Sequence, residues 1–310
     1  MTTTAPDVPD LSTAPESRDR LNLFMGVEAR EVRPGHLVLA QPVGPRFHDH
    51  RGQTILGSVG VLADACPGGA LGNSIPSGAG MVLSQISATL AAPLPAHGLV
   101  ASTGDVVTLD VDSGIGLAAG AMHDGDGNTV AVLQSRGVFV TRPRANADAV
   151  FSGERLPVPA PEPCAAPDEL AGRTGLDVVD AIASEQIARG PLAGLLDIRL
   201  TDIERGSLTA TFAPRDWMSN YLGSIQGGVL ITAADLVNGL VAQTLTAADQ
   251  QYRILDLRID FVRSPATDGP DIRAEAEVVR AGRRLALIES RLLDGSGQVL
   301  IRAAASAQLF

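Results

Sequence analysis

The sequence has little positive charge relative to its negative charge. Its 310 residues include no lysine, and 24 arginines stand against 35 acidic residues, so the formal net charge is -11 and the pI is about 4.9. A chain this acidic lacks the basic surface that binds a phosphate backbone, which excludes nucleic acid as the expected partner. An anionic ligand would need a local arginine cluster.

Cysteines and long apolar runs are also scarce. Cys66 and Cys164 lie in unlike contexts, and no uninterrupted apolar run approaches the roughly 20 residues that span a bilayer. Residues 1–20 contain no basic segment followed by an apolar core, so they do not resemble a signal peptide. These absences predict a reduced, cytoplasmic protein without a membrane span, whose first 20 residues form a disordered tail.

What the chain does contain is an internal repeat. Hydrophobic residues make up 45% of the sequence, enough for two ordinary cores. When "LNLFMGVEAREVRPGHLVLAQP" is set beside "LAGLLDIRLTDIERGSLTATFAP", Gly35 falls on Gly206 at an offset of 171 residues. The same offset places Gly57 on Gly228 and Asp64 on Asp235 without a gap. The sequence therefore predicts a tandem duplication.

Each repeat predicts one helix and five strands. A first strand ("HLVLAQP" or "SLTATFA") precedes a helix that begins near Thr54 or Gly227, and four β-type segments follow. These segments are expected at 80–91, 98–110, 114–123 and 129–141, and at 252–263, 271–280, 284–293 and 298–309. The turns "DGDGN" and "DGSGQ" predict that the last two strands of each repeat pair antiparallel.

The repeats predict two domains joined by a linker. The first spans residues 21–142 and the second residues 176–310, and the Pro/Ala-rich stretch at 143–175 lacks periodicity. An amphipathic helix in "LDVVDAIASEQIAR" precedes the second repeat and has no clear counterpart in the first.

The stretch "NYLGSIQGGVLITAAD" carries the chemistry. Asp235 lies two turns into an apolar helix, where an isolated buried carboxylate would be costly. Its repeat counterpart is Asp64, and both have apolar neighbours. A solvated helix face is the alternative, but the recurrence favours a carboxylate that faces another protein surface.

This stretch resembles the hotdog-fold thioesterases, most closely the phenylacetate-degradation (PaaI-like) type. Asn220, Gln226 and Asp235 keep that family's Asn, His and Asp spacing, and Gly227 and Gly228 occupy its paired-glycine positions. Gln226 replaces the family histidine. In the first repeat the match is weaker, with Asp49, Ile55 and Leu56 at the Asn, His and first Gly positions, the last supplying only a backbone N–H.

The resemblance implies an α+β double hotdog, in which each repeat wraps a five-stranded antiparallel sheet around its central helix. The two helices would run roughly antiparallel and the sheets would join into one. In the family, the helix Asp of one unit faces the helix N-terminus of the other. Site one would then combine Asp64 with the Asn220, Gln226 and Gly227 side, and a degenerate site two would combine Asp235 with Asp49 and Leu56.

The implied activity is hydrolysis of an acyl-coenzyme A thioester. The first-turn N–H of Gly227 would stabilise the developing oxyanion, and an Asp would act as general base or as nucleophile. No metal or redox cofactor is expected. The sequence leaves the oligomeric state open, with a homodimer of double hotdogs as one option. Site one is predicted to dominate, because the charge of Asp49 would repel a second carboxylate at site two.

Two alternatives remain at this stage. A non-catalytic acyl-coenzyme A binding or sensing protein is compatible with the loss of His at Gln226 and with the eroded first repeat. A hotdog-fold enoyl-coenzyme A hydratase or dehydratase is less favoured, because none of the five histidines follows an Asp by five residues.

Other candidate residues carry weaker signals. Arg280, Arg283 and Arg284 could hold the phosphates of coenzyme A, with surface solvation an equal alternative. "FHDH" has too few ligands at zinc-like spacing and favours a polar loop, and Cys66 is predicted to be a buried thiol.

Overall fold

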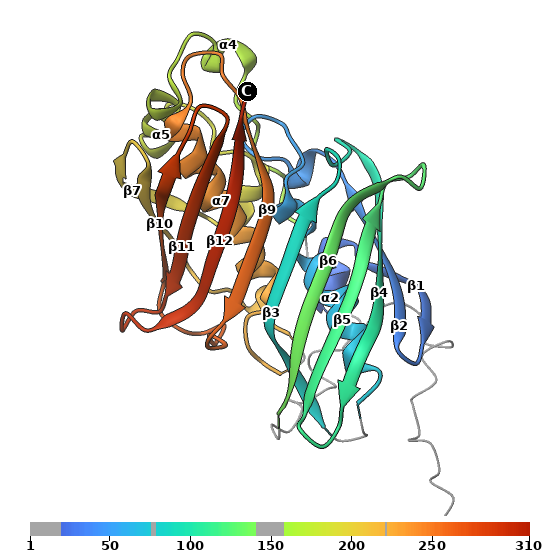
Figure 1. Ribbon diagram of the computed structural model, residues 1–310. Coiled ribbons are helices and arrows are strands. Elements are labelled where there is room, and N and C mark those ends of the chain that lie inside the picture. Colours follow the sequence, from blue (N-terminus) through green and yellow to red (C-terminus); the bar gives the residue numbers. More distant parts are fainter. Residues whose placement is uncertain (1–19, 76–78, 141–157, 221) are drawn as a thin grey trace, which may run out of the picture.

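A single antiparallel sheet runs through the whole molecule. The computed structural model describes residues 20–75, 79–140, 158–220 and 222–310. Twelve described strands are hydrogen-bonded in the order β1-β2-β4-β5-β6-β3-β9-β12-β11-β10-β8-β7 (Figure 1). The strands of the first half are β1 (Glu28–Arg33), β2 (His36–Val43), β3 (Gly80–Leu90), β4 (Gly98–Asp110), β5 (Ile115–His123) and β6 (Thr129–Val140). Those of the second half are β7 (Arg199–Glu204), β8 (Ser207–Phe212), β9 (Tyr252–Phe261), β10 (Ile272–Ala281), β11 (Leu285–Leu293) and β12 (Val299–Leu309).

The two repeats have the same topology, with one strand more in each than the sequence predicted. Every predicted strand is present, and the turns at Asp124 and Asp294 join antiparallel pairs as expected. The prediction of five strands per repeat is wrong, because β1 and β7 add a sixth at each edge of the sheet. Both are largely exposed and rich in charge, so they lack the apolar alternation that marks a half-buried strand.

The central pair of strands carries the symmetry that relates the repeats. β3 and β9 pair antiparallel, with Ser87 opposite Arg258. These positions differ by 171, the repeat offset, and the flanking pair Ile86 with Ile259 mirrors the pair Ala88 with Leu257. A pseudo-twofold axis therefore passes between Ser87 and Arg258 and makes one continuous sheet from two.

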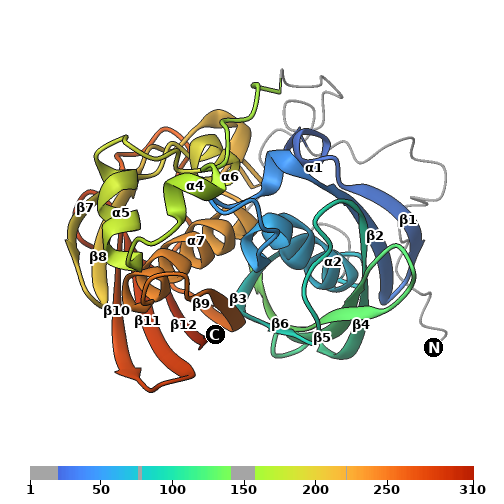
Figure 2. The same ribbon diagram turned by 90° about the horizontal axis from the view of Figure 1, so that it is seen from above.

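Two central helices lie side by side behind the sheet (Figure 2). The helix of the first repeat begins as a 3-10 turn, η3 (Leu56–Val59), and continues as α2 (Gly60–Gly72), whereas the second forms α7 (Gly227–Leu245). Gly57 at the start of one helix meets Thr232 of the other, and Gly60 meets Gly228. The helices are thus antiparallel, as predicted, and a Cβ at Gly60 would lie 2.7 Å from the Gly228 carbonyl oxygen.

The core is shared between the repeats. Buried side chains from both halves form one main hydrophobic cluster, and every residue of α7 after Gly227 is buried. By length and composition alone α7 could cross a membrane, but it is 100% buried within the protein and is its core helix. A fully buried helix is apolar all round, which explains why it shows no amphipathic stripe.

The remaining described helices are short. They are α1 (Arg20–Met25), η2 (Pro45–Phe47), α4 (Pro167–Leu170), α5 (Gly175–Ala183), α6 (Pro191–Leu195) and η4 (Asp216–Met218). The amphipathic helix expected before the second repeat is α5, capped by Thr174, which accepts from the Asp177 N–H. The described part of the expected linker contacts the first repeat, because the Ala165 N–H donates to the His50 carbonyl at 2.9 Å. The predicted tail before α1, and residues 143–157 of the linker, lie outside the described residues.

Candidate active site

Each helix aspartate faces the start of the opposite helix. The Gly57 N–H donates to Asp235 Oδ2 at 2.6 Å. On the other side of the axis, Asp64 lies against Gly227, where an added Cβ would collide with the Asp64 carboxylate. The antiparallel crossing thus builds two composite sites, each from a carboxylate of one repeat and a helix N-terminus of the other.

The two sites differ in which group caps the helix. Gln226 is the N-cap of α7, and its Oε1 accepts the Gly228 N–H at 2.7 Å. The equivalent position in the first repeat is Ile55, which has no polar side-chain atom. The equivalent amide, the Gly57 N–H, therefore donates its hydrogen bond to Asp235 instead. At site one the glutamine performs this capping role, and its Nε2 keeps the capacity to donate.

Asn220 orders the loop that leads to this cap. Its Oδ1 accepts from the backbone N–H groups of Leu222 at 2.9 Å and Ser224 at 3.1 Å. The Gln226 N–H donates to the Met218 carbonyl, which fixes the entry of the chain into α7. Asn220 is therefore a loop-ordering residue upstream of Gln226.

Asp235 is fully buried and lies within the electrostatic influence of Asp49 and Arg51. Burial raises the pKa of its carboxyl to about 7, the Gly57 hydrogen bond lowers it, Asp49 raises it and Arg51 lowers it. Among the described residues, its Oδ1 has no hydrogen-bond partner. One oxygen of this carboxylate accepts a hydrogen bond from the start of the opposite helix. Because the pKa of the carboxyl is near 7, the group is only partly ionised at pH 7.

Asp49 both repels Asp235 and pairs with an arginine. The charge of Asp49 raises the pKa of the Asp235 carboxyl, which is the direction of the predicted repulsion. Asp49 also forms a buried ion pair with Arg51, whose Nη2 lies 2.6 Å from its Oδ2. Burial alone would raise the pKa of Asp49, yet Arg51, His50 and the Gln53 N–H together lower it. The Arg51 guanidinium also lies 3.6 Å from the centre of the Tyr252 ring and donates to the Tyr252 carbonyl. Arg51 therefore offsets part of the Asp49 charge, and the remainder acts on Asp235.

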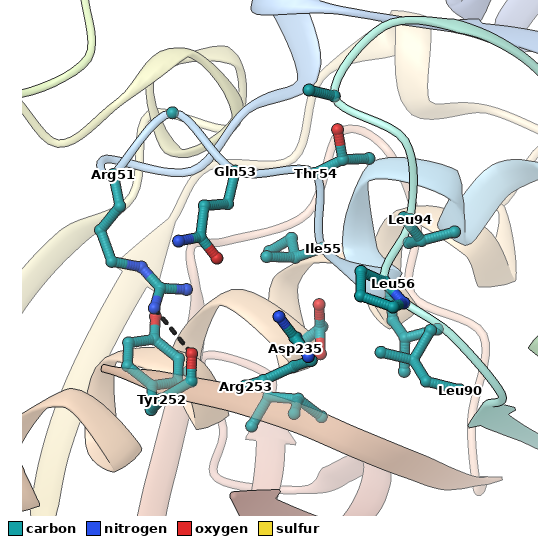
Figure 3. A pocket seen from close by; sticks show the side chains of 15 residues that line it. Arg51, Gln53, Thr54, Ile55, Leu56, Leu90, Leu94, Asp235, Tyr252 and Arg253 are labelled. Carbon is teal, nitrogen blue, oxygen red and sulfur yellow. Dashed lines mark hydrogen bonds between the residues drawn. The ribbon is translucent and has the colours of Figure 1, made fainter. Parts of the chain in front are cut away.

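A pocket of about 220 Å³ opens at site two (Figure 3). Arg51 and Gln53 lie at one end of it, Leu56, Leu90 and Leu94 lie at the other, and Asp235 is at its floor (Figure 3). The pocket is therefore amphipathic, with a polar end and an apolar end.

The arginines predicted to bind phosphate lie on the site-two side of the second repeat. Arg280, Arg283 and Arg284 are exposed at the β10–β11 hairpin, and the Leu309 N–H donates to the Arg284 carbonyl. Since β12 pairs with the Tyr252 end of β9, these arginines lie towards site two. The structure does not bring them to Asp64 and Gly227.

The weaker candidate residues, Cys66 and the histidines of "FHDH", make contacts within the fold. Cys66 is buried, as predicted, donates to the Ser102 carbonyl at 3.1 Å, and has a pKa raised by burial to about 11. In "FHDH", His48 contacts the Ala96 carbonyl, and burial lowers the pKa of His50 to about 4. Within the described ranges, no three His, Cys, Asp or Glu side chains gather as a metal site would require.

Three residues at the sites escaped the sequence analysis. Arg51 could have been found, because an arginine two positions after Asp49 is a natural ion partner. Tyr252 is 201 residues from Arg51. Phe261, whose ring edge lies against Gly227, gave no local signal because it ends an ordinary strand.

Comparison with known proteins supports the coarse assignment. Residues 222–301 match the family model described as the thioesterase superfamily. A candidate esterase of Saccharolobus solfataricus is 27% identical over 111 residues, which cover 36% of this chain and 77% of that protein.

Two solved structures share the fold over nearly the whole chain. A tesB protein of Mycobacterium avium subspecies paratuberculosis superposes with a TM-score of 0.61 at 11% identity, covering 94% of this chain and 98% of its own. The acyl-CoA thioesterase II TesB2 of Mycobacterium marinum gives a TM-score of 0.59 at 11% identity with the same coverage. The expected α+β double hotdog is therefore confirmed.

Proposed function

Because the chain is a double hotdog whose second repeat matches the thioesterase superfamily, we propose that it is an acyl-coenzyme A thioesterase. The observation that carries the proposal is the placement of Asp64 against Gly227, at the first helical position of α7. That position joins a carboxylate to a helix N-terminus, the two groups that thioester hydrolysis needs.

At site one, the thioester carbonyl would lie over the first turn of α7. The first N–H groups of a helix have no partner within it and form its positive dipole end, so the Gly227 N–H can stabilise the developing oxyanion. Gln226 Nε2 supplies a second donor, since its Oε1 already caps Gly228. Gln226 therefore replaces the donor function of the family histidine but not its acid function.

Asp64 would act on the water or on the carbonyl carbon. As a general base it would take a proton from water as the water attacks the carbonyl, and the thiol of coenzyme A would leave. As a nucleophile it would attack the carbonyl carbon and form an anhydride as the C–S bond breaks and the coenzyme A thiolate leaves. Water would then open the anhydride, release the acid and restore the Asp64 carboxylate. Asn220 would contribute indirectly by ordering the loop that positions Gln226.

Site two is the weaker catalytic candidate, and two features add to the repulsion by Asp49 that the sequence suggested. Asp235 Oδ2 occupies the Gly57 N–H, so carboxylate and amide neutralise each other before any substrate arrives. The Asp49 and Leu56 side offers no donor equivalent to Gln226 Nε2, because Ile55 stands there. Because the donor side with Gln226 belongs to site one, we retain Asp64 as the dominant carboxylate.

The direct test is thiol release from a panel of acyl-coenzyme A esters, measured with a thiol-reactive dye. Release that is lost in Asp64→Asn but retained in a surface control, Asp112→Asn, supports the proposal. Ligand-induced thermal stabilisation without thiol release from any ester would overturn hydrolysis in favour of acyl-coenzyme A binding. The cytoplasmic location and the homodimer stay predictions.

A further inference from the structure

Phe261 lies at the point where site one would receive the acyl group. It is the last residue of β9, and a Cβ built on Gly227 would lie 3.1 Å from its ring atom Cζ. The same built Cβ collides with Asp64. The aromatic ring and the carboxylate therefore flank the same helix N-terminus.

The repeat offset identifies the matching residue at site two as Leu90. Leu90 ends β3 as Phe261 ends β9, and the two positions differ by 171. Leu90 borders the open 220 Å³ pocket together with Leu56 and Leu94 (Figure 3). The same position in the site wall therefore carries a branched aliphatic side chain, Leu90, at site two and an aromatic ring, Phe261, at site one.

The two ends of the site-two pocket indicate which part of a thioester each would contact. An acyl chain is apolar and requires the leucine-lined end, whereas the amide-rich arm of coenzyme A suits the end with Arg51 and Gln53 (Figure 3). Phe261 occupies the position equivalent to the apolar end. It therefore faces the acyl part of a thioester at site one.

We propose that Phe261 sets the acyl-chain length at site one and restricts hydrolysis to short acyl groups. This inference rests on the proposed thioesterase function and names its substrate class. A phenyl ring held against Gly227 occupies volume that further methylenes would need, and each methylene excluded from an apolar pocket typically changes discrimination by about 10- to 200-fold.

The test is Phe261→Leu, which gives site one the side chain that site two has. The kcat/KM values for straight-chain acyl-coenzyme A esters of two to ten carbons are compared with those of the wild type. We expect the ratio of the eight-carbon to the two-carbon ester to rise by about 10-fold or more. An unchanged ratio would overturn the proposal.

The control is Phe139→Leu, the same substitution on β6. Phe139 is half-buried and packs against the small cluster of Leu71, Met81 and Ala118, away from Gly227. It reports the general effect of removing a ring from the fold. A matching shift of the ratio in Phe139→Leu would show that loosened packing, not the acyl wall, changes specificity, and would also overturn the proposal.

A binding measurement separates this inference from the proposed function. Non-hydrolysable S-alkyl-coenzyme A thioethers of the same chain lengths are titrated calorimetrically into the wild type and both variants. If no variant hydrolyses any ester, the thioesterase proposal fails. The assignment of Phe261 then stands only if Phe261→Leu alone gains affinity for the longer thioethers.

Discussion

The carboxylate of Asp235 accepts the Gly57 N–H across the helix crossing, at 2.6 Å. Its repeat counterpart differs because the Gly228 N–H is taken by the Gln226 side chain of its own loop, at 2.7 Å. With Ile55 in place of a polar cap, the Gly57 N–H is therefore left to Asp235. The same symmetry builds both sites, but the polar groups in the two sites differ.

Loss of the carboxylate at site one should remove most activity. Replacing Asp64 with Asn is expected to lower kcat by about 10²- to 10⁴-fold, the range for a lost general base, whereas Asp235→Asn should change it by less than about 10-fold. Steady-state thiol release from both purified variants, with folding checked by circular dichroism, measures the difference. Equal losses would mean that both sites turn over.

The donor role of Gln226 can be separated from its capping role. Gln226→Glu keeps an oxygen for the Gly228 N–H but has no N–H to donate, so kcat should fall by about 10²- to 10³-fold with the cap retained. Gln226→Ala loses both functions and should also lower the melting temperature, because a lost N-cap typically costs about 1 kcal/mol. Wild-type activity in Gln226→Glu would rule out donation from Nε2.

The raised pKa of Asp235, about 7 against an ordinary value of 3.8, predicts a pH-dependent stability. Between these two values the folded state binds a proton that the unfolded state has lost. This contribution is therefore fully present below pH 3.8 and disappears as pH rises through 7.

The variant Asp235→Asn isolates this contribution. Its melting temperature minus that of the wild type should become more positive as pH rises from 5 to 8, while groups such as His50 cancel in the difference. Thermal melts at closely spaced pH values measure it. A pH-independent difference would show that Asp235 keeps an ordinary pKa.

The buried ion pair of Asp49 and Arg51 should show strong coupling. Arg51→Met leaves the Asp49 charge without its partner, and removing one member of a buried pair typically costs about 3 to 5 kcal/mol. The double variant Asp49→Asn with Arg51→Met removes both charges and should recover much of that loss. Urea unfolding of the two single variants and the double variant measures the coupling, and additive losses would contradict it.

The sequence by itself determined the duplicated architecture. The offset that pairs Gly35 with Gly206 predicted the repeats, and alternating apolar residues with Asp-Gly turns predicted ten of the twelve described strands. These features could be read because periodicity and turn formation depend on near neighbours in the chain. The charged edge strands β1 and β7 escaped, because an exposed edge imposes no such alternation.

Only the tertiary structure decided which side chains and amides meet at each site. The pairing of Arg51 with Tyr252, the ring of Phe261 against Gly227 and the choice of amide for Asp235 all depend on the antiparallel crossing of α2 and α7. That crossing brings together side chains that are far apart in sequence. No local pattern in the chain encodes such contacts, since they follow from how closely two glycine-lined helices can approach.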